Sequence, residues 1–434
     1  LDKGVRWNIG KVFQGEDLLY QFDLLAEPGH KMPAFINLQQ YHVEKFLVDR
    51  AQALGLDLRW LNRVIGLQSG EQGARITVET PDGAYSLDTR FVIACDGARS
   101  PMRSMLGLEF IGEQFEDQFL IADVRMRADF PVERWFWFDP PFHGGRSCLL
   151  HKQPDDIWRI DLQLSPDADT EHERRPDVVR RRIERMLGNG DFELEWISLY
   201  RFQCRRLACF VHGAVIFAGD AAHQVSPFGA RGANSGVQDA DNLGWKIAAA
   251  LRGRVGLIES YDQERSQAAD ENILHSTRAT DFIAPRHEAE ARFRNAALAL
   301  ARKTEFGKGF VNSGRLSTPT TYANSQISTA DDAPWPAGPA PGAPIPDAPF
   351  GGGYLTERLG SEFALLLWPD SAEAIAMKGV RILCVGARDE ELTARYALAQ
   401  GSAYLIRPDR HVAARFHRVE QASLAAALNR AGGI

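Results

Sequence analysis

A glycine-rich segment, residues 217–236, holds residue types at a spacing that could bind a flat, polar ligand. An apolar run, residues 214–218, leads directly into Gly219-Asp220, so a carboxylate at the end of a buried strand could hold a polyol hydroxyl. The glycines that follow let the backbone approach a ligand closely. A helix predicted to begin near Ala233 adds free N–H groups and a positive dipole end. Ordinary packing of a strand, a turn and a helix is the alternative interpretation.

A second acidic turn occurs earlier in the chain. The apolar run 91–95 ends in Asp96-Gly97, as a buried parallel strand entering a turn would. Arg103 follows and could lie beside a phosphate-bearing cofactor. A capped helix start with a solvated arginine is the alternative.

Two further positions precede this turn. Gln39 and Gln40 open the segment 38–54, whose apolar residues recur at helical spacing. Val64 lies on a strand-like run that follows this predicted helix.

In this order, the segments resemble the flavin-binding motifs of the class A flavoprotein aromatic hydroxylases, the para-hydroxybenzoate hydroxylase-like family. Residues 217–246 are similar to the second flavin motif of the family, and residues 96–107 are similar to its "DG" motif, which is tied to flavin and nicotinamide cofactors. The segment 36–40 is similar to the one in which a glutamine contacts the ribityl chain. The resemblance implies that the following residues bind FAD: Gln39, Val64, Asp96, Gly97, Arg103, Gly219, Asp220, Pro227, Gly229, Gly232, Ala233 and Asn234.

Some of these assignments leave alternatives open. Gln40 or a merely surface glutamine could replace Gln39 as the ribityl contact, and Val64 could be a plain core residue. His223 is expected to pack or to hydrogen-bond within the flavin loop, because no Gly-x-Ser-x-Gly elbow supports hydrolysis. The histidines show no metal-ligand spacing, so no metal site is expected.

The resemblance also implies a reaction. NAD(P)H reduces FAD, the reduced flavin takes O2 to a C4a-hydroperoxide, and an oxygen atom passes to a small phenolic substrate. The cofactor carries this chemistry, and the protein binds, orients and excludes water.

Activation of a phenol requires a base with a pKa near the working pH. His143, Asp161 and Gln163 are the candidates, with Gln163 as a hydrogen-bonding orienter. Arg159, Asp161 and Gln163 alternate with apolar residues and therefore share one face of a strand. That face could line a substrate cavity or lie in water.

Other functions remain open at this point. A flavoprotein of the same fold could oxidise a polyketide or an antibiotic, by hydroxylation or Baeyer–Villiger insertion. A non-catalytic homologue that has lost FAD binding is a further alternative. The expected partners are a small phenolic substrate and O2, and a homodimer is one assembly that the chain could form.

The same resemblance organises the chain into an α/β protein with three domains. A discontinuous FAD-binding, Rossmann-like domain (GR2 type) covers residues 1–108 and 200–330. An antiparallel β-sheet substrate domain, residues 109–199, is inserted into it. A Pro/Gly-rich linker, residues 331–353, leads to a thioredoxin-like domain, residues 354–434. That domain is expected to contain a helix between its first two strands, and it has no C-x-x-C pair for redox chemistry.

Composition supports a folded, multidomain protein. The chain has 434 residues, of which 44% are hydrophobic, enough for two to three packed domains. The net charge of −7 gives no basic footprint for nucleic acid, and no apolar run is long enough for a membrane span. Five cysteines without a C-x-x-C pair fit a reducing cytoplasm.

The beginning of the chain lacks an expected feature. A class A hydroxylase should start with a strand, Gly-x-Gly-x-x-Gly and a helix that hold the ADP half of FAD. Neither that motif nor the acidic residue after it occurs here, and the chain begins with Leu1 rather than Met. We therefore expect that a front βαβ unit of roughly 80–110 residues is missing. A chain that truly began at Leu1 would be expected to bind FAD weakly.

Overall fold

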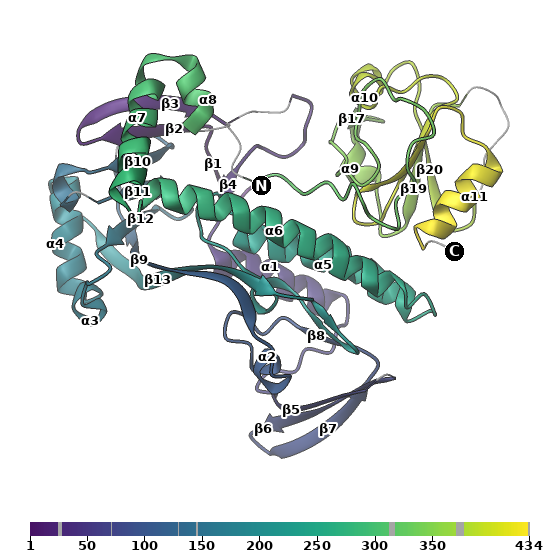
Figure 1. The fold of residues 1–434 in the computed structure, drawn as a ribbon, viewed down its shortest axis with the longest axis horizontal. Coiled ribbons are helices and arrows are strands. Elements are labelled where there is room, and N and C mark those ends of the chain that lie inside the picture. The colour runs from purple at the N-terminus through teal and green to yellow at the C-terminus, as the bar shows by residue number, and fades with distance from the viewer. Residues whose placement is uncertain are drawn as a thin grey trace.

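Two long helices lie side by side through the middle of the protein, α5 (Gly232–Ala250) and α6 (Leu257–Ile283) (Figure 1). A large sheet lies at one end of this pair, and a C-terminal domain with its own sheet lies beside the other end. The computed structural model describes residues 1–24, 28–70, 72–128, 130–144, 146–311, 317–369 and 377–432.

Two short parallel strands, β8 (Val92–Ala94) and β15 (Val215–Phe217), lead into the two acidic turns. Strand β15 is fully buried, as an uninterrupted apolar run predicts. Strand β14 (Val211–His212) pairs with β15 in the antiparallel sense, and β8 pairs with β15 in parallel. Among the described residues, β8 pairs with no strand on its other side, and Ile93 is 42% exposed.

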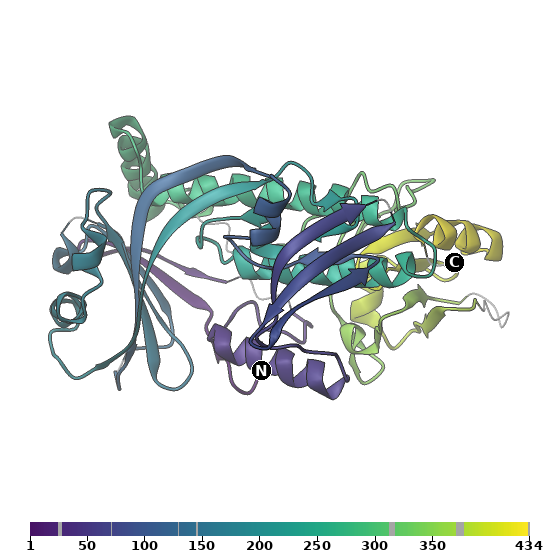
Figure 2. The same ribbon diagram turned by 90° about the horizontal axis from the view of Figure 1, so that it is seen from below.

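Smaller elements complete this part of the chain, which Figure 2 shows from below. They are β1 (Val5–Arg6), β4 (Ile36–Asn37), α1 (Gln40–Ala53), the antiparallel strands β5 (Arg63–Gly70), β6 (Gly73–Thr80) and β7 (Gly83–Thr89), α2 (Pro101–Met105), α7 (Glu288–Lys303) and α8 (Glu305–Val311). The helical periodicity of residues 38–54 therefore predicts α1 well. No helix in the described part of the chain is long and apolar enough to cross a membrane.

The large sheet has eight strands in the order β16-β13-β9-β12-β11-β10-β2-β3. Their bounds are β2 (Ile9–Gln14), β3 (Asp17–Asp23), β9 (Phe110–Arg125), β10 (Arg134–Phe138), β11 (Cys148–Lys152), β12 (Ile157–Leu164), β13 (Glu193–Leu207) and β16 (His223–Gln224). The sheet thus extends beyond the predicted range 109–199. The early strands join it because β2 pairs in parallel with β10 and because Val12 and Tyr20 pack against Phe138.

One face of the large sheet is apolar and covered. Helix α4 (Pro176–Leu187) buries Val179 and Ile183 in a core with alternate residues of β9 and β12, such as Leu120 and Ile160. Helix α3 (Thr170–Glu173) and the 3₁₀ turn η1 (Pro141–His143) lie at the edge of this layer. Since strand side chains alternate, the residues between them point to the opposite face.

The C-terminal domain is a four-stranded sheet in the order β20-β19-β21-β22, with one parallel pair, β19 and β20. Its elements are β17 (Pro349–Phe350), β18 (Gly353–Tyr354), α9 (Leu355–Arg358), β19 (Phe363–Leu367), β20 (Val380–Cys384), α10 (Glu390–Tyr396), β21 (Ala403–Ile406), β22 (Val412–Phe416) and α11 (Gln421–Arg430). Both faces of β19 are buried in apolar clusters. The predicted helix between the first two strands falls largely on residues 370–376, outside the described residues.

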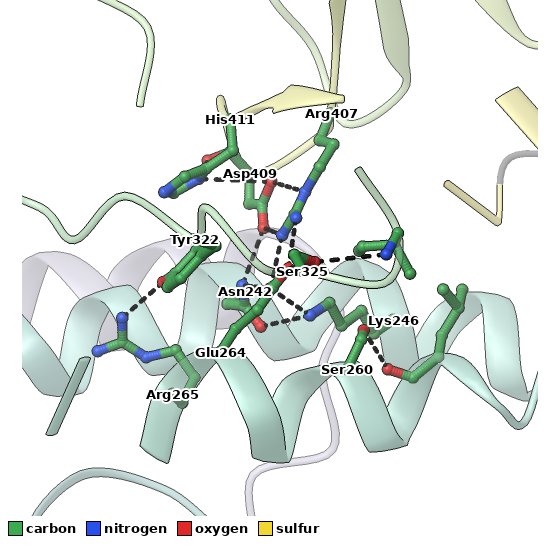
Figure 3. Close-up of polar contacts among 12 residues, drawn as sticks. Asn242, Lys246, Ser260, Glu264, Arg265, Tyr322, Ser325, Arg407, Asp409 and His411 are labelled. Carbon is green, nitrogen blue, oxygen red and sulfur yellow. Dashed lines mark hydrogen bonds and ion pairs between the residues drawn. The ribbon is translucent and has the colours of Figure 1, made fainter. Parts of the chain in front are cut away.

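A buried group of charged residues joins this domain to α5 and α6 (Figure 3). Arg407, in the β21–β22 hairpin, donates from Nη1 to Glu264 Oε1 at 2.6 Å, and Lys246 Nζ contacts Glu264 Oε2 at 2.7 Å. Burial alone would raise the pKa of Glu264, but the charges of Arg407 and Lys246 hold it well below the usual value. Burial lowers the pKa of Lys246 to about 8. The contacts of the group therefore depend on one another.

Glu264→Gln should lower the free energy of unfolding by about 3 kcal/mol, because it leaves two buried cations without their shared counter-charge. Urea unfolding measures this change. Glu288→Gln is the matched control, since the Glu288–Arg292 pair is exposed and should leave the unfolding free energy nearly unchanged. Equal, small effects of both substitutions would contradict a structural role for the buried group.

Candidate functional site

The predicted ligand-binding carboxylate, Asp220, lies in a tight turn, η2 (Gly219–Ala221), directly after β15. Gly219 has a φ of +61°, a left-handed conformation in which a side chain would be strained. A Cβ on Gly219 would lie 4.0 Å from Gly236 Cα, so the turn packs on the backbone of α5. Burial raises the pKa of Asp220. The turn therefore holds a partly desolvated carboxylate next to the first turns of α5.

Helix α5 begins without a side-chain cap. Arg231 is the N-cap residue and makes no side-chain capping bond. The first helical hydrogen bond runs from the Ser235 N–H to the Arg231 carbonyl at 2.8 Å. The N–H groups of Gly232, Ala233 and Asn234 are thus the donors that a helix leaves open at its start, where a negative group is favoured.

The loop before α5 is fixed by its own contacts. The Ala230 N–H donates to the Pro227 carbonyl at 3.0 Å, and the Asn234 side chain donates to the Ala230 carbonyl at 2.6 Å. Gly229 within it has a φ of +89°. The predicted flavin residues of this loop and of the helix start therefore form one continuous structure.

The two acidic turns are joined by Arg103. Its Nη1 donates to the Ala221 carbonyl at 3.2 Å and its Nη2 donates to the Ala98 carbonyl at 2.8 Å. Asp96 accepts the N–H of the second residue of α2 at 3.0 Å, and Gly97 has a φ of +81°. The structure thus brings the Asp96-Gly97 turn beside η2, as the order of the motifs predicts.

Gln39 contacts the loop between β11 and β12, and Val64 contacts the core around β8 and β15. Gln39 is buried at the start of α1, where its Nε2 donates to the Pro154 carbonyl at 2.9 Å and its Oε1 has no hydrogen-bond partner. Gln40 is exposed and bonds to Glu44. Val64 is half-buried in β5 and packs against the core around β8 and β15. A core role and a backbone contact to a ligand are therefore both compatible with Val64.

These features fit the group that the motifs imply. An uncapped helix start suits the electron-rich edge of a flavin ring, a partly buried carboxylate suits a ribityl hydroxyl, and the unpartnered Gln39 Oε1 is a further buried acceptor. In the described residues, no group of three or more His, Cys, Asp or Glu side chains could hold a metal ion.

The three candidates for a catalytic base differ in their hydrogen bonding. His143 Nε2 contacts the Gln163 carbonyl at 2.7 Å, and burial, together with nearby arginines of α4, lowers the His143 pKa to about 4. The Gln163 side chain accepts hydrogen bonds from the backbone and the hydroxyl of Ser147. Asp161 Oδ1 is buried and has no hydrogen-bond partner among the described residues. Asp161 is thus the candidate with an unused acceptor.

Asp161 lies on the face of the large sheet opposite α4, among charged neighbours. Strand register places Arg134, His151, Arg159 and Asp123 side by side in the adjacent row. Arg159 pairs with Asp123 through two hydrogen bonds of 2.8 Å. Burial raises the Asp161 pKa to about 6, against the opposing charges of Arg159 and Arg134. The carboxyl group therefore changes protonation close to neutral pH.

The flavin motif and this sheet are physically continuous. His223 and Gln224 form β16, the edge strand of the large sheet, and pair with the end of β13. Phe228, in the loop before α5, packs on Phe119 and Phe202 of the sheet, with ring centroids 5.3 Å apart in both pairs. The predicted cofactor loop therefore borders the same sheet that carries Asp161.

Family models match most of the chain. Residues 4–276 match the model described as "FAD binding domain", and residues 338–433 match "Aromatic-ring hydroxylase, C-terminal". The chain belongs to the FAD-binding-domain family. This match covers both acidic turns, the α5 start and the large sheet, so FAD is the cofactor of this FAD-binding protein and its fold is the α/β fold expected above.

Two curated relatives illustrate the range of similar proteins. A 12-dehydrotetracycline 5-monooxygenase/anhydrotetracycline 6-monooxygenase of Streptomyces rimosus is 30% identical over 59% of this chain and 54% of its own. A 3-(3-hydroxy-phenyl)propionate/3-hydroxycinnamic acid hydroxylase of Mycolicibacterium smegmatis is 26% identical over 76% of this chain and 60% of its own. The FAD-binding protein thus spans little more than half the length of these relatives.

A solved structure shows the same fold. The flavin-dependent monooxygenase PieE, in complex with FAD and substrate, has a TM-score of 0.82 at 20% identity, covering 99% of this chain and 88% of its own. At this identity the likeness shows the fold alone.

Asp239 and Arg265 are polar residues of the site that motif reasoning missed. Asp239 is fully buried on α5, where it accepts the Gly219 N–H at 2.8 Å, contacts His223 Nε2 at 2.7 Å and accepts from Arg265 Nε at 2.6 Å. His223, which was expected to pack or to hydrogen-bond within the flavin loop, stacks on the Phe210 ring and contacts Asp239 of α5. The sequence does contain a pattern that could have identified Asp239. Polar residues recur at helical spacing along α5 as a stripe: Ser235, Asp239, Asn242 and Lys246.

Asp220→Ala should weaken FAD binding by about tenfold or more, because it removes a partly buried acceptor for a cofactor hydroxyl. Fluorescence titration with FAD measures the dissociation constant. Asp270→Ala, which removes a surface carboxylate paired with Arg206, is the control and should bind FAD normally. Full FAD affinity in Asp220→Ala would remove Asp220 from the site.

Proposed function

We propose that this protein is an FAD-dependent monooxygenase that hydroxylates a small phenolic substrate with NAD(P)H and O2. One observation carries the proposal: the loop that starts the FAD site packs, through Phe228, on the sheet that holds Asp161 on its face opposite α4. A ring bound between that loop and that face would contact cofactor and polar side chains together. The family-model matches and the hydroxylase relatives support the same reaction class.

The residues of the two acidic turns and of the α5 start hold the cofactor in this proposal. Asp220 would accept a hydrogen bond from a ribityl hydroxyl, and the N–H groups of Gly232, Ala233 and Asn234 would favour negative charge on the flavin ring. FAD, when bound and reduced by NAD(P)H, supplies the activation of O2 for transfer of one oxygen atom to the aromatic ring. The protein positions the cofactor and the substrate and excludes water from them.

Asp161 acts on the substrate proton in this proposal. Its ionised carboxylate accepts the proton of the phenol hydroxyl, which makes the ring richer in electrons at the positions that oxygen attacks. Arg134 and Arg159 are the cations that act on Asp161, and they would stabilise the phenolate that forms. The aromatic cluster of Phe115, Phe119 and Phe202 borders the loop and limits water there.

A larger polycyclic substrate is the second candidate. It is favoured by the tetracycline-modifying relative, which is 30% identical over 59% of this chain. For either substrate class we place the reaction in the cytoplasm, because all five cysteines are free thiols in the structure. A homodimer stays a prediction.

Purified protein loaded with FAD should show a bound-flavin spectrum, and a phenolic substrate should accelerate NAD(P)H oxidation and O2 uptake. A panel of phenols, carboxylated phenols and polycyclic phenols ranks the substrate classes. Stimulation by polycyclic compounds alone would select the second candidate. A flavin-free protein, even after reconstitution, would indicate a non-catalytic homologue and contradict the proposal.

Asp161→Asn should reduce the substrate-stimulated rate by about 100-fold, since the amide cannot accept a proton. In the unsubstituted enzyme the rate should rise with pH through about 6, because Asp161 must lose its proton to act as a base. Stopped-flow rates between pH 5 and pH 8 test both statements. If the rate of Asp161→Asn still rises with pH through about 6, another group is responsible for that rise.

A further inference from the structure

The turn that carries Asp220 is held by a side chain from α5. Asp239 Oδ2 accepts the Gly219 N–H and contacts His223 Nε2, so a single carboxylate ties the two ends of the flavin motif's first turn. Its other oxygen accepts from Arg265 Nε at 2.6 Å. Burial would raise the Asp239 pKa, but His223 and Arg265 outweigh it and hold the pKa below the usual value. Asp239 is therefore ionised, and both of its carboxylate oxygens have hydrogen-bond partners.

The contacts of Arg265 lead toward the C-terminal domain. Its Nη1 donates to the Tyr322 hydroxyl at 2.8 Å, and its Nη2 donates to the Ser235 hydroxyl at 3.0 Å. The Tyr322 ring stacks on the His411 ring, with centroids 4.7 Å apart and planes at 25°. His411 belongs to the β21–β22 hairpin, so three successive contacts join that hairpin to Asp239. Figure 3 shows Arg265, Tyr322 and His411 of this path.

The hairpin is fixed in turn by the charged group on α5 and α6. Arg407 forms ion pairs with Glu264 and with Asp409, and all three side chains are buried. Asn242, one helical turn after Asp239, donates to Glu264 at 2.8 Å and to Asp409 at 3.1 Å. Neighbouring residues of α5 therefore contact the flavin-motif turn and the C-terminal hairpin.

We propose that the C-terminal domain helps to position Asp220 for binding of the flavin cofactor. The β21–β22 hairpin fixes Tyr322 and, through it, Arg265, which holds Asp239 against the Gly219 N–H and so places Asp220. Asp239, Arg265 and Tyr322 are positioning residues for the cofactor, which they do not touch themselves. This inference rests on the proposal that Asp220 binds FAD.

Burial and charge favour the transfer of a displacement from Tyr322 through Arg265 to Asp239. Buried hydrogen bonds between ionised groups are strong and geometrically strict, and loss of one partner leaves an uncompensated group without water to replace it. Each of Asp239, Arg265 and Tyr322 is at most 2% exposed. A shift of the Arg265 guanidinium therefore moves Asp239 rather than being absorbed by solvent.

Tyr322→Phe tests the path with little disturbance, because the phenyl ring keeps the stack on His411 and loses only the hydroxyl. FAD affinity, measured by fluorescence titration of the full chain, should fall by about threefold to tenfold. The visible circular dichroism of the bound flavin should change as well, since the ring surroundings shift. Arg381→Gln is the control: it removes an exposed ion pair with Glu362 in the same domain, outside the hairpin and the path, and should leave both measurements unchanged.

Asp239→Asn and the double variant complete the test. Asp239→Asn should weaken FAD binding more than Tyr322→Phe does, and adding Tyr322→Phe to it should cause little further loss, because both act through the same turn. Thermal unfolding of the FAD-free variants separates instability from positioning. Unchanged FAD affinity and flavin circular dichroism in Tyr322→Phe, with the unsubstituted protein binding FAD, would overturn this inference alone. Failure of the unsubstituted protein to bind FAD would instead overturn the proposed function.

Discussion

The buried carboxylate of Asp239 is the constraint on which the candidate site depends. An ionised group in an apolar interior must be satisfied by donors, and here a backbone N–H, a histidine ring and a guanidinium supply them. Each donor comes from a different element: the turn after β15, strand β16 and helix α6. The need to satisfy one charge therefore fixes three elements relative to α5, and it sets the place where Asp220 and the open start of α5 meet.

One face of the large sheet packs on a helix, and the proposal assigns the chemistry to the other face. One face packs on α4 through apolar side chains and fixes the strand register. That register places charged residues on the other face, where Asp161 keeps an acceptor that no side chain uses. Because β16 and Phe228 belong to both the sheet and the flavin motif, a rigid scaffold connects the two sets of residues. Such pre-positioning is what oxygen transfer to a bound ring requires.

Sequence patterns predicted the local features well and the long-range ones poorly. Uninterrupted apolar runs identified β8 and β15, and the acidic turns follow them as expected. The sequence also predicted a helix from near Ala233, yet in α5 the apolar Val237 is 62% exposed while the polar residues Ser235, Asp239, Asn242 and Lys246 are buried. Periodicity gives the faces of a helix but not the partner of each face. The contact between Arg407 and Glu264 joins residues 143 positions apart and has no local signature.

The central claim is that residues of this chain direct one oxygen atom from O2 onto an aromatic ring. A reaction of the FAD-loaded protein with NAD(P)H and a stimulating phenol under 18O2 tests it most directly, with product mass as the readout. The account predicts that the hydroxylated product carries one 18O atom. Substrate-stimulated NAD(P)H oxidation that yields only hydrogen peroxide, or a product whose added oxygen comes from water, would contradict it.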